Sequence, residues 1–480
     1  MFDRQTASAP ERLTGWGCTA PSVATVVRVR SAADTGAALA SAGVRGATAR
    51  GLGRSYGDAA QNGGGTVLDC TCREAAPGAG DLAAIDAIDA ARGTIAVGGG
   101  ASLQAIQRAV LPNGWTLPVL PGTWHVTAGG AIASDVHGKS HHVDGSFGAH
   151  VEAFTLALPG ATGDAGEVRE VSRASDPALF DATTGGMGLT GVIVAATLRL
   201  APVETRFVRF DSRRTPDLDA TMRALVEGDA GHRYSVAWID LAGSRGRGIV
   251  STADHARLDD LPAPLRDARL DAPERRLAGR PIPRPAVPPI VPVNLVTRVA
   301  VRWFNEAWFR RPEARGVLQP LAAYLAPLDA VRGWNRLYGP RGLIQYQFAL
   351  PRGEEAELRA IVEAIAGAPA VPALAVLKRF GPGRDAPLSF PIEGWTLAVD
   401  FPAVPSLGPF LDRLDRRVAA AGGRVYLAKD ARMRAEMVPL MYPRIREWRE
   451  TRARVDPRGV LTSDLDRRLQ LTAATMGGAP

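Results

Sequence analysis

The sequence predicts an α+β protein with two domains. Before Pro202, strand and helix patterns are separated by glycine-rich turns, whereas the segments after it alternate polar and apolar residues, which is typical of antiparallel strands. Dense glycine and polar motifs return near Gly423. We therefore expect a first domain over residues 1–201, completed by residues 424–480. A second domain, built on an antiparallel sheet, is expected over residues 202–423.

The expected elements of the first domain follow in chain order. They are a strand at Val23–Arg30, a helix at Asp34–Ala42, a segment at Val44–Ala49 that leads into a glycine-rich loop, and strands at Thr66–Cys70, Thr94–Val97 and Val192–Ala196. Ser102 is expected to cap a helix that runs through Val110, because a serine hydroxyl accepts a hydrogen bond from a backbone N–H of the first turn. The pattern is strand, helix, strand, loop, strand.

The loop at Ala49–Ala59 contains three glycines beside two arginines, at Gly51, Gly53 and Gly57. Glycine permits a positive φ and a close backbone approach, so successive N–H groups can converge on an anion. A dinucleotide fingerprint would open a helix, but a strand follows here, and a strand also follows the G-x-G-x-x-G run at Gly186–Gly191. A turn that grips a pyrophosphate fits better than a Rossmann loop, and a plain hairpin turn is an equal alternative.

Five of the seven histidines fall in one glycine-rich stretch, at His125, His137, His141, His142 and His150. No carboxylate set accompanies them, so we expect no metal site. Small residues at Thr127–Ala133 would let a flat ring lie against the backbone, and His137 could hydrogen-bond that ring or a substrate hydroxyl. A purely structural role is a fair alternative for His141 and His142.

The net charge of +8 comes almost entirely from arginine, because the chain has only three lysines, Lys139, Lys378 and Lys429. Arginine cannot replace a titrating amine, so these lysines are candidate functional residues. No nucleic-acid motif is present, and we expect no nucleic-acid partner. The three cysteines, Cys18, Cys70 and Cys72, give no disulfide or metal spacing. The N-terminus has no apolar signal region, and no apolar run reaches about 18 residues, so no spanning helix is expected.

In the second domain we expect strands at Phe207–Phe210, Tyr234–Ile239 and Leu343–Leu350, and helices at Glu354–Ala366 and Leu407–Ala421. A closing strand at Gly423–Asp430 is expected where the chain returns to the first domain. Residues 263–315 are rich in proline and arginine, which predicts a mobile loop rather than a core element. Its apolar residues mixed with arginines would suit an anionic membrane surface, and a disordered insertion is an equal alternative. These residues are Ile290, Val291, Val293 and Leu295, with Arg280, Arg284, Arg298 and Arg302.

These motifs together resemble the vanillyl-alcohol-oxidase family of flavoproteins, which has a p-cresol-methylhydroxylase-type (PCMH-type) FAD-binding domain and an antiparallel-sheet substrate domain. In the first half the resemblance rests on Arg50–Asp58, Leu120–Thr123, Asp135–Lys139 with His141 and His142, Gly145–Gly148 and Gly188–Gly191. In the second half it rests on Ala237–Trp238, Trp334–Arg336, Gln345–Phe348, Phe380–Pro382, Pro387–Pro391 and Ala428–Asp430. The second-half blocks are similar to the branch that acts on a polyprenylphosphoryl ribose.

The resemblance implies FAD with its pyrophosphate on the glycine loop. The implied cofactor contacts are Arg50, Gly51, Leu52, Gly53, Arg54, Ser55, Tyr56, Gly57, Asp58, Gly122, Thr127, Ala128, Gly129, Gly130, Ser134, Asp135, Val136, His137, Ile193 and Tyr426. Relatives with a tethered flavin often have histidine where this chain has Arg54. Guanidinium is a poor nucleophile, so we expect non-covalent FAD.

The resemblance also implies the reaction, which is oxidation of the 2′-hydroxyl of decaprenylphosphoryl-β-D-ribose to the 2′-keto sugar. This would be the first half of epimerisation to the arabinose lipid of cell-wall arabinan. Implied substrate contacts are Tyr56, Lys139, Trp238, Tyr324, Gln345, Gln347, Lys378, Thr396 and Lys429. Lys429 and His137 are the candidate catalytic residues, and which of them takes the hydroxyl proton is left open.

A separate NADH-dependent keto-reductase subunit would complete the inversion, and the chain would lie at the plasma membrane in the bacterial cell envelope. In mycobacterial relatives the block Gly394–Phe401 carries a cysteine beside the flavin, and Ala398 holds that position here. The three cysteines of this chain are expected away from the substrate pocket. Two alternatives are an aldonolactone or alditol oxidase of the same family and a flavin-free binding protein of the envelope.

Overall fold

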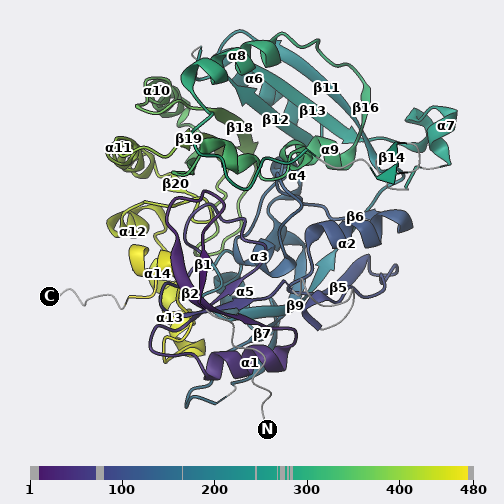
Figure 1. Ribbon diagram of the computed structural model, residues 1–480. Coiled ribbons are helices and arrows are strands. Elements are labelled where there is room, and N and C mark those ends of the chain that lie inside the picture. The colour runs from purple at the N-terminus through teal and green to yellow at the C-terminus, as the bar shows by residue number, and fades with distance from the viewer. Residues whose placement is uncertain are drawn as a thin grey trace.

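A computed structural model describes residues 10–71, 81–164, 166–243, 246–267, 269–270, 276–277, 280–281 and 285–473. Cys72 and Arg284, both considered above, lie outside these residues. The N-terminal sheets form the lower half of the molecule in Figure 1, and the largest sheet forms the upper half. The mixture of helices and mostly antiparallel sheets confirms the α+β fold class.

The first sheet of the lower half has the strand order β1-β2-β4-β3. The strands are β1 (Glu11–Leu13), β2 (Ser22–Arg28), β3 (Ala47–Arg50) and β4 (Thr66–Asp69). Helix α1 (Ala32–Ala40) joins β2 to β3, and its N-terminus is capped by Ser31, whose Oγ accepts from the Asp34 N–H at 3.1 Å. Both β2 and β3 pair parallel with β4. The glycine-rich loop between β3 and β4 therefore connects parallel strands, which excludes the hairpin alternative.

The second sheet of the lower half is antiparallel, with the order β5-β9-β7-β8. Its strands are β5 (Thr94–Gly98), β7 (Val151–Ala157), β8 (Val168–Ser172) and β9 (Val192–Arg199), and β6 (Trp115–Thr116) pairs separately with β10 (Ala201–Pro202). The helices around it are α2 (Leu103–Val110), α3 (Ala128–Ala133), α4 (His141–Asp144) and α5 (Pro177–Thr183). As expected, Ser102 caps α2 by accepting from the Ala105 N–H at 3.1 Å.

The upper half is one antiparallel sheet with the order β16-β11-β13-β12-β18-β19-β17-β20. Its strands are β11 (Phe207–Thr215), β12 (Tyr234–Ile239), β13 (Gly248–His255), β16 (Val317–Pro320), β17 (Leu343–Pro351), β18 (Leu374–Phe380), β19 (Gly394–Pro402) and β20 (Arg424–Val425). The larger helices around it are α6 (Leu218–Asp229), α10 (Glu355–Ala366) and α11 (Leu407–Ala420), with α9 (Leu321–Leu325) between the halves (Figure 1). Short 3-10 helices lie at Asp81–Ala83, Leu111–Asn113, Phe147–His150, Leu258–Asp260, Pro327–Ala330, Trp334–Tyr338 and Ala435–Met437.

The proline- and arginine-rich region differs from its expectation as a loop. It contains α7 (Ala263–Arg266), a small hairpin of β14 (Arg276–Leu277) and β15 (Arg280–Pro281), and the 12-residue helix α8 (Arg298–Phe309). Thr297 caps α8 by accepting from the Ala300 N–H at 3.2 Å. The prolines that precede Thr297 obscured this helical segment, because proline runs are typical of loops. Among the described residues, no helix is both long and apolar enough to cross a membrane.

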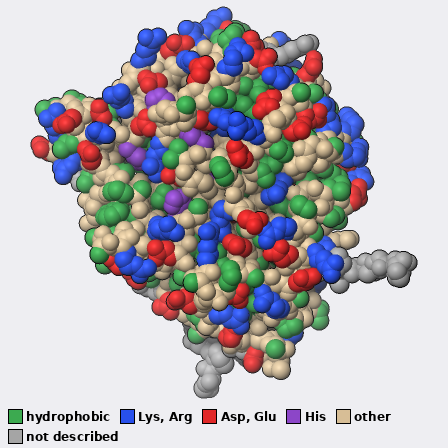
Figure 2. Space-filling model, turned by 180° about the vertical axis from the view of Figure 1, so that it is seen from behind, with side chains coloured by type: hydrophobic (Ala, Val, Ile, Leu, Met, Phe, Trp, Pro, Cys, Tyr) green, Lys and Arg blue, Asp and Glu red, His purple; other side chains and the backbone are tan. Residues whose placement is uncertain are grey.

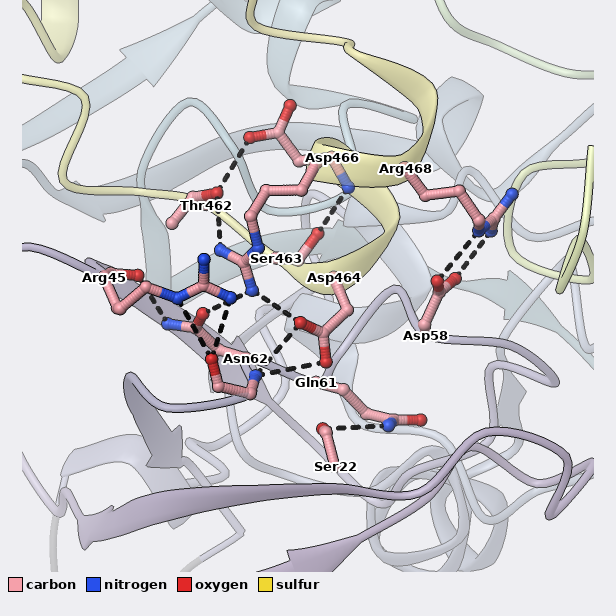
Figure 3. A network of polar contacts seen from close by, with 12 residues as sticks. Ser22, Arg45, Asp58, Gln61, Asn62, Thr462, Ser463, Asp464, Asp466 and Arg468 are labelled. Atoms are coloured by element: carbon pink, nitrogen blue, oxygen red, sulfur yellow. Dashed lines mark hydrogen bonds and ion pairs between the residues drawn. The ribbon is translucent and has the colours of Figure 1, made fainter. Parts of the chain in front are cut away.

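The C-terminal segment returns to the lower half with α12 (Val438–Met441), α13 (Ile445–Val455) and α14 (Asp464–Leu469). Figure 3 shows α14 beside the residues that follow the glycine loop. Asp464 accepts from the Gly63 N–H at 3.0 Å, and Arg467 donates to Asn62 at 2.7 Å. The expected closing strand is shorter than predicted, since β20 covers only two residues and pairs with β17 of the upper sheet.

Charged side chains of both signs are interspersed over the face seen in Figure 2. The net charge of +8 is therefore not gathered into a single basic patch on that face. Because alternating signs leave little long-range field, this face lacks the electrostatic focusing that steers polyanions.

Candidate active site

A cavity of about 800 Å³ lies between the two halves of the molecule. Three walls form it: the glycine-rich loop after β3, the region around α3, and one face of strands β17, β18 and β19. Residues of the segment 328–336, which connects α9 to the upper sheet, also line the cavity. Because Leu328, Val331 and Arg332 are exposed, we call this part of the lining the mouth. The first wall carries backbone donors, and the last carries titratable side chains.

The glycine-rich wall offers unsatisfied backbone donors. Within the described chain, the N–H groups of Gly51, Leu52, Gly53 and Ser55 have no hydrogen-bond acceptor. Gly53 has φ +64°, the left-handed region that favours glycine, and a Cβ on Gly51 would lie 2.4 Å from Thr127 Oγ1. Arg54 is held beside the loop, where its guanidinium lies 4.2 Å from the Trp16 ring and donates to Leu52 O at 2.6 Å. Such a loop can bind a pyrophosphate through its backbone.

The α3 wall is built from small residues that fit closely. Thr127 caps the helix by accepting from the Gly130 N–H at 3.1 Å, and a Cβ on Gly129 would lie only 3.0 Å from Gly99 O. Tyr426 closes one end, because its hydroxyl donates to Ser134 O at 2.7 Å and its ring stacks on Phe390 at 4.6 Å. This wall therefore presents backbone and small side chains, against which a flat ring system can lie.

The sheet wall follows from strand register. Gln345 and Gln347 are two residues apart on β17, so their side chains share one face. Gln347 pairs with Ala398 of β19, which pairs with Val376 of β18. Lys378 lies two residues beyond Val376 on the same face. These five side chains all line the cavity, although they come from three separate segments of the chain.

His137 is locked in place on the cavity wall by an amide. The Gln347 Nε2 group donates to His137 Nε2 at 2.9 Å and also approaches Thr396 Oγ1 at 3.3 Å. Thr396 in turn donates to Phe348 O at 2.9 Å. Burial, with nearby Lys378, lowers the pKa of His137 well below its usual value, so the ring is neutral. Its Nδ1 atom is buried without a partner. Both contacts of the Gln347 Nε2 group are therefore made to other side chains of the protein.

Lys429 lines the cavity, and its Nζ lies 3.9 Å from the centroid of the Tyr56 ring. Burial lowers its pKa to about 7, Asp400 opposes this shift, and Lys378 adds to it. The pKa of Asp400 is raised by its complete burial, although Gln345, which donates to Asp400 Oδ1 at 2.5 Å, and Lys429 oppose that rise. Burial also lowers the pKa of Lys378 to about 8. The site thus holds two amines that can become neutral near physiological pH.

Lys139 and Tyr324 are close to this group but outside the cavity wall. The Lys139 ammonium donates to Tyr324 O and lies 4.2 Å from the centroid of that ring. Burial, with a smaller contribution from the charge of Lys378, lowers the pKa of Lys139 to about 7. Lys378 also lowers the pKa of Lys429, so its charge acts on both of the other lysines. Trp238 pairs with the cavity residue Val376 across the strands, and Thr396 pairs with Lys378. Neither Trp238 nor Thr396 lines the cavity.

Most residues expected at the cofactor line the cavity, and four do not: Gly57, Asp58, Ala128 and Asp135. Gly57 and Asp58 face the C-terminal segment instead, since a Cβ on Gly57 would meet Asp430 O at 1.9 Å and Asp58 pairs with Arg468. Ala128 is fully buried in α3. Asp135 is a structural brace that accepts from the Gly148 N–H at 2.9 Å and the Ser389 hydroxyl at 2.5 Å.

The expectation that the cysteines lie away from the pocket was wrong for Cys18 and Cys70, which both line the cavity. Cys18 sits next to Trp16, and Asn335 Nδ2 approaches its Sγ at 3.5 Å. Sequence reasoning also missed Trp16 and Asp400. Trp16 lies in a segment without a recognisable motif, and the role of Asp400 depends on the cross-strand pair that it forms with Gln345. Among the described residues, no cluster of histidine, cysteine, aspartate or glutamate is arranged to hold a metal ion.

The cavity suits FAD by its own chemistry. Unsatisfied N–H groups on the glycine loop match a pyrophosphate, and the glycine- and alanine-rich α3 wall matches a planar ring. Residues 23–168 match the family model described as "FAD binding domain". The fold and the site thus define an FAD-dependent oxidoreductase.

The relatives narrow this class further. The chain is 43% identical to the decaprenylphosphoryl-β-D-ribose oxidase of Mycolicibacterium smegmatis, over 98% of this chain and 100% of that protein. It is also 43% identical to an uncharacterised protein from the mprA 5′ region of Streptomyces coelicolor, over 77% of this chain and 100% of the relative. L-Gulonolactone oxidase 5 of Arabidopsis thaliana is 28% identical over only 36% of this chain and 29% of its own length. The chain belongs to the family of the decaprenylphosphoryl-β-D-ribose oxidase.

Proposed function

We propose that this chain oxidises the 2′-hydroxyl of decaprenylphosphoryl-β-D-ribose to a ketone, with FAD bound non-covalently. The observation that carries the proposal is Lys429, an amine on the wall of an FAD-type cavity whose pKa is lowered to about 7 by burial. The relative from Mycolicibacterium smegmatis supports the choice of substrate, because the match covers 98% of this chain and so includes the second half as well as the FAD half.

Oxidation of a secondary alcohol removes a hydride from carbon and a proton from oxygen. FAD, when bound, supplies the hydride acceptor. The protein must therefore supply a base for the hydroxyl proton, and the base must be neutral before it can act. Lys429 meets this requirement, because burial and Lys378 both favour its neutral amine. Asp400 stabilises the ammonium that forms when Lys429 accepts the proton.

Of the two catalytic candidates, Lys429 suits the base role better than His137. The Nε2 atom of His137 already accepts from Gln347 at 2.9 Å, and its Nδ1 therefore carries the ring hydrogen. His137 acts instead as a positioning residue, because it fixes the Gln347 amide so that the amide oxygen can accept from a sugar hydroxyl. Tyr56, Gln345 and Lys378 complete the sugar-binding wall in this proposal.

The mouth of the cavity suits an amphiphilic substrate. Leu328 and Val331 are 37% and 36% exposed there, beside the exposed Arg332. An arginine among apolar side chains can bind a phosphate while the prenyl chain stays on apolar surface. We also propose peripheral contact with the bacterial plasma membrane for this reason.

The ketone must be reduced by a hydride donor other than the sugar itself before it can become the arabinose lipid. Neither glycine motif of this chain opens a helix, since Gly51–Ser55 leads to β4 and Gly186–Gly191 leads to β9. A nicotinamide cofactor is therefore assigned to a separate NADH-dependent keto-reductase, which would act on the product.

Anaerobic mixing of the holoenzyme with polyprenylphosphoryl ribose, followed by the visible flavin absorbance, tests this function. The flavin absorbance of the wild-type enzyme should fall after mixing. The Lys429→Ala variant should retain FAD, but its flavin absorbance should not change. Lys429→Arg should fail as well, because arginine stays protonated. If an aldonolactone bleaches the flavin and polyprenylphosphoryl ribose does not, the family alternative is correct. Protein purified without flavin absorbance would favour the binding-protein alternative.

A further inference from the structure

Helix α8 exposes apolar side chains that a helix on a water-soluble surface normally buries. Val299, Trp303 and Phe304 are 68%, 74% and 57% exposed, and their spacing places them on one side of the helix. The opposite side holds Val301 and Asn305, which are buried. The apolar side therefore faces outward, and this is the reverse of the usual amphipathic arrangement.

The orientation of α8 is fixed by polar contacts to the upper sheet. Asn305 Nδ2 donates to Asp240 Oδ1 at 2.8 Å, and Arg247 donates to Glu306 at 2.7 Å. Buried Asp240 also accepts from Arg247 at 2.9 Å. Because these anchors hold the inner side, α8 cannot turn to bury Trp303 without breaking a buried polar network.

The chain before α8 extends the apolar surface. Ile290, Val293 and Leu295 are 81%, 58% and 50% exposed. We call residues 290–304 with these six apolar side chains the α8 face, which lies at the upper edge of the molecule in Figure 1. Surface patches of this kind on a monomer mark interaction sites.

Charge indicates which partner the α8 face fits. Four arginines, Arg298, Arg302, Arg310 and Arg311, lie in or directly after α8. The single acid of the helix, Glu306, is already paired with Arg247 and Arg310, both at 2.7 Å. Aromatic side chains bordered by arginine are typical of segments that lie in the headgroup region of an anionic bilayer.

The α8 face is joined to the cavity mouth by backbone hydrogen bonds. The Arg332 N–H donates to Pro285 O at 2.8 Å, the Val287 N–H donates to Arg332 O at 2.8 Å, and the Leu295 N–H donates to Leu337 O at 2.9 Å. The segment that leads to α8 thus forms a continuous structure with residues 332–337. A bilayer that touches the α8 face would also lie near the mouth.

We propose that the α8 face docks on an anionic phospholipid bilayer, with Trp303 and Phe304 at headgroup depth, and so presents the cavity mouth to a membrane-held substrate. The second part rests on the proposed function. Moving a long prenyl chain into water is strongly unfavourable, so an enzyme that modifies the headgroup of this lipid must meet it at the membrane. The docked face would let the sugar enter the cavity while the chain stays in lipid.

The test compares binding of the holoenzyme to vesicles of phosphatidylglycerol and of phosphatidylcholine. Wild type should sediment with phosphatidylglycerol vesicles, and brominated lipid should quench part of its tryptophan fluorescence. The double variant Trp303→Glu/Phe304→Glu should lower the partition coefficient at least tenfold and remove that quenching. Arg302→Glu should weaken binding mainly at low salt, because it acts through charge. Leu440→Glu, at a 62% exposed position on α12, is the matched control and should bind as wild type does.

Turnover separates this proposal from the proposed function. The double variant should keep its melting temperature, its FAD and its activity on a water-soluble short-prenyl phosphoribose, and lose activity only on long-prenyl substrate in vesicles. If no prenylphosphoryl ribose reduces the flavin of the wild-type enzyme, the proposed function is wrong. The vesicle-binding data still test, independently, whether the α8 face docks on a bilayer. Equal vesicle binding by wild type and the double variant would overturn the docking proposal. The docking proposal would also be overturned if the double variant bound vesicles as wild type does but lost a protein complex that light scattering detects in the wild type.

Discussion

Arg468 of α14 joins two segments that are far apart in the sequence, one at Asp58 and one at Asp430. We expect its removal to destabilise the protein. Its guanidinium donates to both oxygens of Asp58, at 2.9 and 2.7 Å, and to Asp430 at 2.7 Å (Figure 3 shows the Asp58 pair). Asp58 and Asp430 are only 8% and 5% exposed. Arg468→Met would leave two nearly buried carboxylates without their cation.

Removal of one partner from a buried ion pair costs about 3–5 kcal/mol. The unfolding entropy of a 480-residue chain, at about 2.1 cal/mol/K per residue, is about 1 kcal/mol/K. If the chain unfolds as one unit, the melting temperature of Arg468→Met should therefore fall by about 3–5 °C. Arg446→Met is the matched control, because its partner Glu450 is exposed and the pair contributes less than about 1 kcal/mol.

The pH dependence of the melting temperature tests whether the ion pairs of Arg468 cause this destabilisation. Burial raises the pKa of Asp430, but Arg468 and two backbone N–H groups lower it, and the net shift is downward. A carboxylate with a lowered pKa in the folded state contributes stability above its unfolded pKa, and this contribution is lost as the pH falls through the folded value. The gap between wild type and Arg468→Met should be widest near neutral pH and should narrow below about pH 4. Scanning calorimetry of the holoenzymes measures both effects. Equal melting temperatures for the Arg468 and Arg446 variants would refute the argument.

Three further predictions concern the site. Acid precipitation should leave a yellow supernatant, because Arg54 cannot form a covalent bond to the flavin; a yellow pellet would contradict this. The rate of flavin reduction should rise with pH through about 7, as Lys429, whose pKa is lowered by burial, loses its proton; a rate that does not change between about pH 6 and 8 would remove Lys429 from the base role. The Ala398→Cys variant should gain a covalent adduct after turnover with a nitrobenzothiazinone, since position 398 lies on the sheet wall between Gln347 and Val376. Intact-protein mass spectrometry and peptide mapping should find no adduct on the wild-type protein. An adduct on Cys18 of the wild type would show that the cavity wall already offers a reactive thiol.

Local patterns predicted the elements well wherever one segment decides its own structure. β12 was expected at Tyr234–Ile239 and has those bounds, and the cap of α2 at Ser102 follows from the serine itself. These features depend on residues that are close in the sequence. The glycine loop was recognisable as a turn, but the choice between an anion-binding loop and a plain hairpin required the parallel pairing of β3 with β4.

The site required contacts between distant segments, and single-segment patterns could not supply them. Asp400 is unremarkable in sequence, yet cross-strand pairing places it opposite Gln345 and within the field of Lys429. Helix α8 was missed because proline-rich sequence precedes it, and the whole stretch was therefore interpreted as a loop. Cys18 reached the cavity wall through the contact of residues 16–18 with Asn335, which is more than 300 residues away.

The C-terminal segment also sets the order in which a newly made chain can mature. The Ala47 N–H at the start of β3 bonds to Val460 O, and Ala47 O accepts from the Thr462 N–H. The strand that leads into the glycine loop therefore lacks this neighbour until residues 460–462 have been synthesised. During synthesis, the first two hundred residues must wait beside the growing substrate half with this edge unpaired. Because Tyr426, Ala428 and Lys429 also line the cavity, the cofactor site cannot be complete before this segment has been synthesised.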